Sequence, residues 1–139
     1  MTEPMNKELL IALCGYYPYG VIVMIEGYGT HKLKGIDNGT ISTDRGINYP
    51  LRLVKPYLRT IESITEEELN EINNTIYDGV IIEDGTFVFN KDGNWFNPTF
   101  PEIVELFKWC NSHFIDYHGL IPDGLALEAK EGMYKTQDL

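Results

Sequence analysis

The sequence predicts an α+β protein, and three observations support that prediction. Residues 20–58 hold four short runs of strand-forming residues separated by turn residues, with no helix-length pattern between them. Residues 65–112 hold two segments of helical periodicity with a hairpin pattern between them. The composition, 43% hydrophobic and 23% charged over 139 residues, is typical of a globular protein large enough to bury a core.

The first element is a helix predicted over residues 4–14. Met5, Leu9 and Leu13 recur on one helical face, and Gly15 is the expected end. The run 21–25 follows between glycines and reads as a strand buried on both faces. Residues 31–36 are its expected antiparallel partner.

Two more strands are predicted in the N-terminal half. The Asn38-Gly39 pair indicates a tight turn, and residues 40–42 form a short strand after it. Residues 51–54 are the fourth strand, which Pro56 is expected to end because proline cannot donate to a ladder. Together these elements predict a small, bent antiparallel sheet, which could close partly into an SH3-like barrel.

The C-terminal half is predicted as two helices and a hairpin. Thr65 and Glu68 form a capping-box pattern that begins one helix, and the hairpin 80–90 turns at Asp84-Gly85. A further helix begins at Pro101. Its expected buried stripe is Ile103, Leu106, Phe107 and Cys110. Residues 125–129 read as a last strand or an extended strap.

Charge divides the chain unevenly. Residues 1–59 carry a net charge of +2 and residues 60–139 carry −12, which together give the net charge of −10. We therefore expect two lobes, a helix-and-sheet lobe over 1–59 and an acidic lobe over 60–139, either as separate domains or around one shared core. The acidic part should repel duplex nucleic acid.

The expected location is the cytoplasm. Cys14 and Cys110 lie among apolar neighbours and read as two buried thiols, a disulfide being the alternative. The sequence shows no signal-peptide pattern and no apolar run near the length of a membrane span, so we expect no membrane partner.

Aromatic side chains define the first candidate site, a protein-binding surface. Tyr16, Tyr17 and Tyr19 are closely spaced, and tyrosine offers a large amphipathic contact area. We add Tyr57 and Arg59 from the end of the sheet region. The alternative interpretation is that the early tyrosine rings fill the end of the sheet.

A cluster of potential metal ligands defines the second candidate site. Cys110, His113, Asp116 and His118 lie within nine positions, a density that zinc sites show. The pattern lacks the paired cysteines of structural zinc sites. The alternative is that the two histidines cap the helix end while Cys110 packs in the core.

The leading functional hypothesis is a non-enzymatic protein-interaction or adaptor module that needs no cofactor. The familiar catalytic and phosphate-binding patterns are absent from the sequence. The first alternative is a metal-dependent hydrolase centred on His113, Asp116 and His118. The second is weak nucleic-acid binding through the basic N-terminal lobe. The competing interpretation of its basic residues, which we favour, is that they dock onto the acidic C-terminal part. The basic residues are Lys32, Lys34, Arg52, Lys55 and Arg59.

Several phrases of the chain resemble a family of short uncharacterised proteins from gut Bacteroidetes and their phages or prophages. The phrases are residues 19–21, 54–59, 63–68, 116–121, 124–129 and 131–134. His118 stands where the resemblance leads us to expect arginine, which argues against His118 as a required ligand. The family has no assigned activity, so the resemblance implies only a small cytoplasmic accessory protein, of mobile-element origin, and no catalytic residue.

Overall fold

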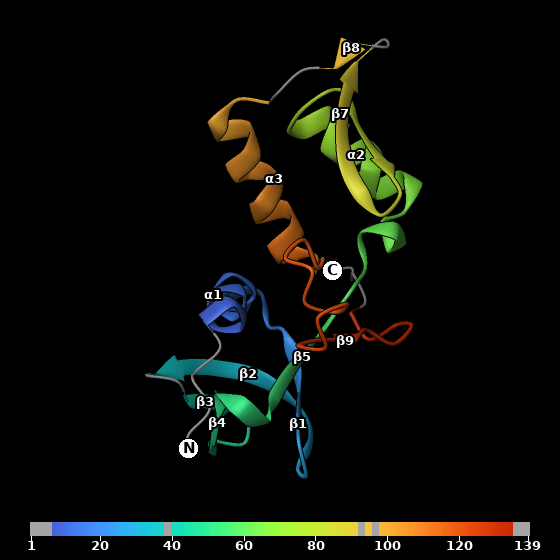
Figure 1. The fold of residues 1–139 in the computed structure, drawn as a ribbon. Coiled ribbons are helices and arrows are strands. Elements are labelled where there is room, and N and C mark those ends of the chain that lie inside the picture. The colour runs from blue at the N-terminus through green and yellow to red at the C-terminus, as the bar shows by residue number, and fades with distance from the viewer. Residues whose placement is uncertain (1–6, 38–39, 92–93, 96–97, 135–139) are drawn as a thin grey trace. The chain divides into compact units, whose positions relative to one another are not determined.

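The computed structural model describes residues 7–37, 40–91, 94–95 and 98–134, and it has an α+β fold (Figure 1). The chain divides into two compact units. Unit 1 comprises Met1–Leu58 with His118–Leu139, and unit 2 comprises Arg59–Tyr117. In this division the described residues 118–134 group with the N-terminal sheet. Unit 2 is therefore an insertion within unit 1.

Unit 1 is built on a six-stranded sheet in the order β4-β3-β2-β1-β5-β9. All neighbours are antiparallel except β5 and β9, which are parallel. The predicted pairing of the first two strands is confirmed, with Val23 opposite His31. The strands are β1 (Ile22–Ile25), β2 (Gly29–Asp37), β3 (Thr40–Thr43), β4 (Asn48–Pro50), β5 (Val54–Leu58) and β9 (Leu127–Glu128). The predicted turn at residues 38–39 lies outside the described residues.

The first strand is buried on one face, and the expectation of two buried faces is wrong. Val23 and Ile25 are fully buried, whereas Ile22 and Met24 between them are half-buried. The residues before and after Leu33 on β2, Lys32 and Lys34, are exposed. One face of the sheet therefore holds the core of unit 1, and we call the opposite face the outer sheet face.

The predicted fourth strand is also placed differently. Leu51–Leu53 forms a short 3-10 helix, η2, and the strand β5 begins at Val54. Pro56 lies inside β5 opposite Val23 instead of ending the ladder. A proline fits there because its nitrogen can face the other side of the strand, where the pairing with β9 begins only at Tyr57.

Helix α1 (Lys7–Tyr16) buries Leu9, Ala12 and Leu13 on one face and lies beside the sheet (Figure 1). Gly15, the expected end, lies within the helix. A 3-10 turn, η1 (Tyr17–Tyr19), follows directly and ends at Gly20, which has a φ of +84°. That left-handed conformation favours glycine and turns the chain into β1. The first residues of the predicted helix, 4–6, lie outside the described residues.

The returning C-terminal segment completes the sheet. Leu127–Glu128 adds the short strand β9, and the Ala129 amide donates to the Leu58 carbonyl at 2.7 Å. The Tyr134 hydroxyl accepts a hydrogen bond from the Ile22 amide at 2.7 Å and donates to the Tyr57 carbonyl at 2.8 Å. This hydroxyl thereby joins β1 to β5, and residues 127–134 are both strand and strap.

Unit 2 combines two helices with a three-stranded sheet in the order β6-β7-β8. Its core includes Ile64, Ile72, Val80, Leu106, Trp109 and Ile115. The predicted hairpin is confirmed, since Asp84 and Gly85 both take positive φ values at its turn. The elements are η3 (Ile61–Ser63), α2 (Glu66–Thr75), β6 (Val80–Glu83), β7 (Thr86–Lys91), β8 (Asn94–Trp95) and α3 (Phe100–Ser112).

Both helices of unit 2 begin with a capping box. The predicted box is confirmed, because the Glu68 amide donates to the Thr65 hydroxyl and the Thr65 amide donates to the Glu68 carboxylate. Thr99 and Glu102 make the same exchange at the start of α3. Such caps fix where a helix begins because they satisfy amides that lack intrahelical partners.

Helix α3 ends on Phe114 in a left-handed conformation, with a φ of +60°. The Ile115 amide donates to the Cys110 carbonyl, and the Phe114 amide donates to the Asn111 carbonyl, which is the Schellman pattern. Glycine is usual at this position. Here the Phe114 ring is buried and its carbonyl accepts from the Arg59 amide at 2.7 Å, so packing holds the strained conformation.

Candidate interaction surfaces

Two residues of the predicted aromatic surface are buried in unit 1. The Tyr16 side chain is fully buried, and its ring meets the His118 ring edge-on at 6.3 Å between centroids. Tyr57 is 3% exposed, with the Lys130 ammonium 5.9 Å from its ring centroid. Both tyrosines are therefore corrected from surface residues to packing residues, because the C-terminal segment returns to cover them.

Tyr17 and Tyr19 remain at the surface. They lie on η1 and are 39% and 46% exposed, whereas Tyr16 points inward from the end of α1. The close spacing of the three tyrosines therefore divides between core and surface. Each interpretation of this segment is right for part of it.

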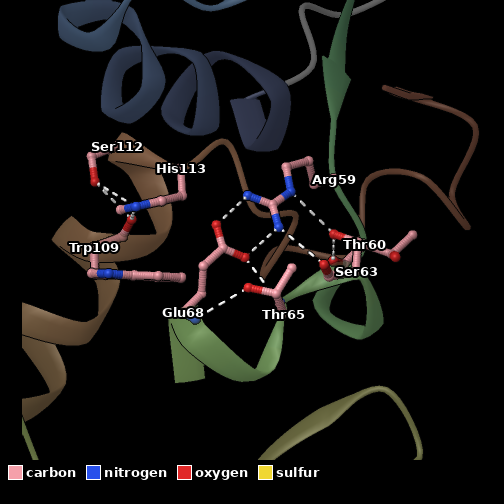
Figure 2. A network of polar contacts seen from close by, with 8 residues as sticks. All are labelled: Arg59, Thr60, Ser63, Thr65, Glu68, Trp109, Ser112 and His113. Carbon is pink, nitrogen blue, oxygen red and sulfur yellow. Dashed lines mark hydrogen bonds and ion pairs between the residues drawn. The ribbon is translucent and has the colours of Figure 1, made fainter. Parts of the chain in front are cut away.

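Arg59 is held inside unit 2 by a network of polar contacts (Figure 2). Its guanidinium donates to both oxygens of the Glu68 carboxylate, at 2.9 and 2.7 Å, and to the Ser63 carbonyl at 3.0 Å. The two charged side chains are only 18% and 16% exposed. The Arg59 donors are therefore occupied by Glu68 and Ser63 within unit 2, and a binding role for Arg59 stays a prediction.

The Arg59 interaction changes the acidity of Glu68. Burial by itself raises the pKa of a carboxyl group, but the hydrogen bonds from Arg59 and the Thr65 amide, with the positive charge of Arg59, outweigh it. The pKa of Glu68 consequently lies below its ordinary value. Glu68 is thus charged while it serves both as the partner of Arg59 and in the cap of α2.

His113 is the C-cap residue of α3 and follows Ser112 directly. Its Nδ1 lies 2.9 Å from the Trp109 carbonyl, which can only accept, so Nδ1 carries the proton. The imidazole also stacks on the Trp109 ring at 3.9 Å between centroids (Figure 2 shows both side chains). This arrangement matches the helix-capping alternative for His113 and leaves Nδ1 occupied.

The structure distributes the four potential metal ligands over both units. Cys110, His113 and Asp116 belong to unit 2, whereas His118 belongs to unit 1 and meets Tyr16. Burial raises the pKa of the Cys110 thiol to about 12, so it is not a ready thiolate ligand. Within the described residues, no three His, Cys, Asp or Glu side chains are placed to hold a metal ion.

The cysteines differ in exposure. Cys110 is buried as expected, but Cys14 is exposed on α1, so the expectation of two buried thiols is wrong for Cys14. Both thiols are free, and no disulfide joins them.

The outward side of α3 carries apolar side chains that the sequence pattern did not place at the surface. Phe100 is 77% exposed and Phe107 is 41% exposed, with half-buried Val104 between them. Positions i, i+4 and i+7 share one side of a helix. The Phe107 ring stacks on Tyr117 at 4.7 Å between centroids. We call these four residues, Phe100, Val104, Phe107 and Tyr117, the α3 aromatic face.

The assignment of Phe107 to the buried stripe is therefore wrong. Trp109 takes that place in the core beside Leu106 and Cys110. The sequence did contain a usable signal, since Phe100, Val104 and Phe107 are a second apolar row on the same helix. A helix with two apolar rows cannot bury both against a single small core.

A polar contact fixes the orientation of Tyr117 in this face. Its hydroxyl donates to the Asn111 side-chain oxygen at 2.9 Å. Burial raises the pKa of Tyr117 more than this hydrogen bond lowers it, so the hydroxyl stays protonated and keeps donating. The stacked pair of Phe107 and Tyr117 is consequently a preformed aromatic surface.

Comparisons with known proteins do not assign this surface to a family. No family model, curated protein or solved structure matches the chain. The resemblance to the Bacteroidetes and phage proteins stays a prediction. None of the helices in the described part of the chain is long and apolar enough to span a membrane.

Proposed function

We propose that this chain is a non-enzymatic protein-interaction module and that the α3 aromatic face is its contact surface. The observation that carries the proposal is the exposure of Phe100 and Phe107 on one side of a single helix, at 77% and 41%. Apolar residues clustered on a surface indicate an interaction site more strongly than scattered ones, because contact of adjacent rings with water is unfavourable. Aromatic rings are also enriched at the centres of protein interfaces.

The energetics favour docking at this face. Full burial of a phenylalanine side chain contributes about 1.5 to 3 kcal/mol relative to exposure. Phe100 has most of that free energy still to gain, and Phe107 has part of it. The Tyr117 ring is half-buried against the core of unit 2 and holds the Phe107 ring by stacking, so docking at Phe107 carries little further entropic cost.

Charge indicates the chemistry of the partner. Residues 59–117 contain twelve acidic and three basic side chains, a net charge of −9. A partner with an apolar surface edged by lysine or arginine would match both the apolar side chains of the α3 aromatic face and the negative charge of unit 2. The partner that we propose is therefore a protein with a basic surface.

Site-specific cross-linking tests the proposal. A photo-reactive benzoylphenylalanine replaces Phe100 in the full chain, and a matched chain carries it at Ile11, which is 66% exposed in unit 1. The expected result is a cross-linked protein that forms from position 100 only and carries an excess of basic residues at the linked segment. Cross-links that are the same from both positions, or none from position 100, would overturn the proposal.

A second measurement separates a partner from a second copy of this chain. Sedimentation of the purified protein should show a monomer, and the Phe100→Ser chain should sediment identically. A dimer that Phe100→Ser dissociates would contradict a basic partner, because the face would then be covered by itself.

A further inference from the structure

The outer sheet face of unit 1 carries a group of exposed lysines. Lys32 and Lys34 extend from β2, and Lys55 extends from β5 next to Met24 in the pairing with β1. Lys130 of the returning segment lies over the Tyr57 ring, two residues along β5 from Lys55. Within the described residues, no ion pair joins any of these four lysines to a carboxylate.

These lysines carry positive charge on a chain that is strongly acidic as a whole. The whole protein has a net charge of −10 and contains 21 acidic residues to 11 basic ones. Lys32, Lys34 and Lys55 nevertheless extend from one face of the sheet, and none of them forms an ion pair with a described carboxylate. The sheet therefore presents a local positive patch that can attract an anion.

Apolar and aromatic groups accompany the charge. Ile22 and Met24 are half-buried between the lysine-bearing strands. The Lys32 ammonium lies beside Gly20, since a Cβ added there would be 3.7 Å from the Lys32 Nζ, and the residue before this glycine is exposed Tyr19. An anion that also offers flat rings can use both features.

We propose that the outer sheet face of unit 1 binds single-stranded nucleic acid, with Lys32, Lys34, Lys55 and Lys130 contacting phosphates and Tyr19 stacking on a base. Single strands combine regular phosphates with exposed base faces, and proteins bind them with basic grooves and aromatic platforms. An acidic polypeptide would use the lysines but has no base to stack on Tyr19. The proposal concerns a different surface from the α3 aromatic face, so either can fail alone.

Salt dependence gives the expected size of the effect. Each phosphate contact contributes about −0.7 to the slope of log affinity against log salt for single strands. Three to four lysine contacts give a slope of about −2 to −3. Affinity for a fluorescein-labelled 15-nucleotide oligo(dT), followed by anisotropy, should then fall about 20- to 50-fold from 50 to 200 mM salt.

Matched variants identify the surface. Lys32→Gln with Lys55→Gln should weaken binding and make the slope less steep by about 1.4. Lys7→Gln with Lys108→Gln removes the same charge from α1 and α3 and should bind like the native chain, which controls for net charge. Tyr19→Ser should weaken binding while leaving the slope unchanged, a result that loss of charge cannot produce.

Three results would overturn the proposal. The first is no detectable binding of the native chain at 50 mM salt. The second is an equal loss of affinity in the two lysine pairs. The third is displacement of the oligonucleotide by an equal charge concentration of polyglutamate, which would make an acidic polypeptide the partner. Circular dichroism of each variant verifies that it is folded.

Discussion

Replacing Glu68 by glutamine should destabilise unit 2 by removing the charge that holds Arg59. Glutamine still accepts the Thr65 amide, so the capping box survives and the perturbation is confined to the ion pair. Arg59 then loses one of its two hydrogen bonds to residue 68, and the bond that remains has a neutral amide oxygen as its acceptor. The remaining guanidinium stays mostly buried.

The magnitude follows from the burial of the pair. Exposed ion pairs contribute at most about 1 kcal/mol, whereas breaking a fully buried pair costs about 3 to 5 kcal/mol. At 18% and 16% exposure this pair lies nearer the buried limit. We expect Glu68→Gln to lower the free energy of unfolding of unit 2 by about 2 to 4 kcal/mol. A double-mutant cycle with Arg59→Met should give a coupling of about 1.5 to 3 kcal/mol.

Tryptophan fluorescence during urea unfolding measures this effect within unit 2. Both tryptophans of the chain, Trp95 and Trp109, lie between residues 59 and 117, so their emission does not report unit 1. Glu67→Gln removes an equivalent charge from the first turn of the same helix and is the control. A coupling below about 0.5 kcal/mol, or an equal loss in the control, would refute the reasoning.

Acidification provides an independent check on the same pair. The pKa of Glu68 is lower in the folded chain than its ordinary value of 4.5, so the folded state binds this proton less readily than the unfolded state. Its stabilising contribution is present above about pH 4.5 and is lost as the pH falls through the folded pKa. Between pH 5 and 3, the stability of Glu68→Gln should fall less than that of Glu67→Gln; parallel curves would contradict the pKa shift.

Two further substitutions and a labelling experiment test other features of the structure. Asn73→Ala should destabilise unit 2 by about 2 to 4 kcal/mol in urea unfolding. The Asn73 side chain accepts hydrogen bonds from the Gly79 and Val80 amides and donates to two carbonyls, and the alanine loses all of them. The control is Asn74→Ala at an exposed position, which should be nearly neutral. Tyr134→Phe should speed hydrogen exchange at the Ile22 amide, which loses its acceptor, and unchanged exchange would disprove the link between β1 and β5. A thiol reagent at pH 8 should label one cysteine of the native chain, Cys14, and both after denaturation, since burial raises the pKa of Cys110 to about 12.

The elements that could be predicted from the sequence depend on neighbouring residues. The capping box of Thr65 and Glu68 and the Asp84-Gly85 turn both match the structure. Their hydrogen bonds and backbone angles are set within a few positions, so the residue types are sufficient to specify them. The α+β class and the antiparallel pairing of the first two strands follow from the same local rules.

The fate of the candidate site residues depended instead on distant parts of the chain. Tyr57 is covered by a segment more than seventy positions away, and Arg59 is neutralised by Glu68 on the following helix. The residue type alone does not indicate whether another segment of the folded chain will contact that side chain. The aromatic surface predicted around Tyr16 therefore shrinks to Tyr17 and Tyr19, and a new one is found on α3.

The sequence by itself determined the α+β class, the capping box of Thr65 and Glu68 and the Asp84-Gly85 turn, because these depend on local backbone chemistry. Only the tertiary structure decided which aromatic and charged side chains stay in contact with water. The exposure of these side chains depends on the packing of residues 118–134 against the first sheet and on the burial of Trp109, and not Phe107, in the core of unit 2. Burial is a property of packing between segments remote in sequence, so it is settled only when the chain has folded.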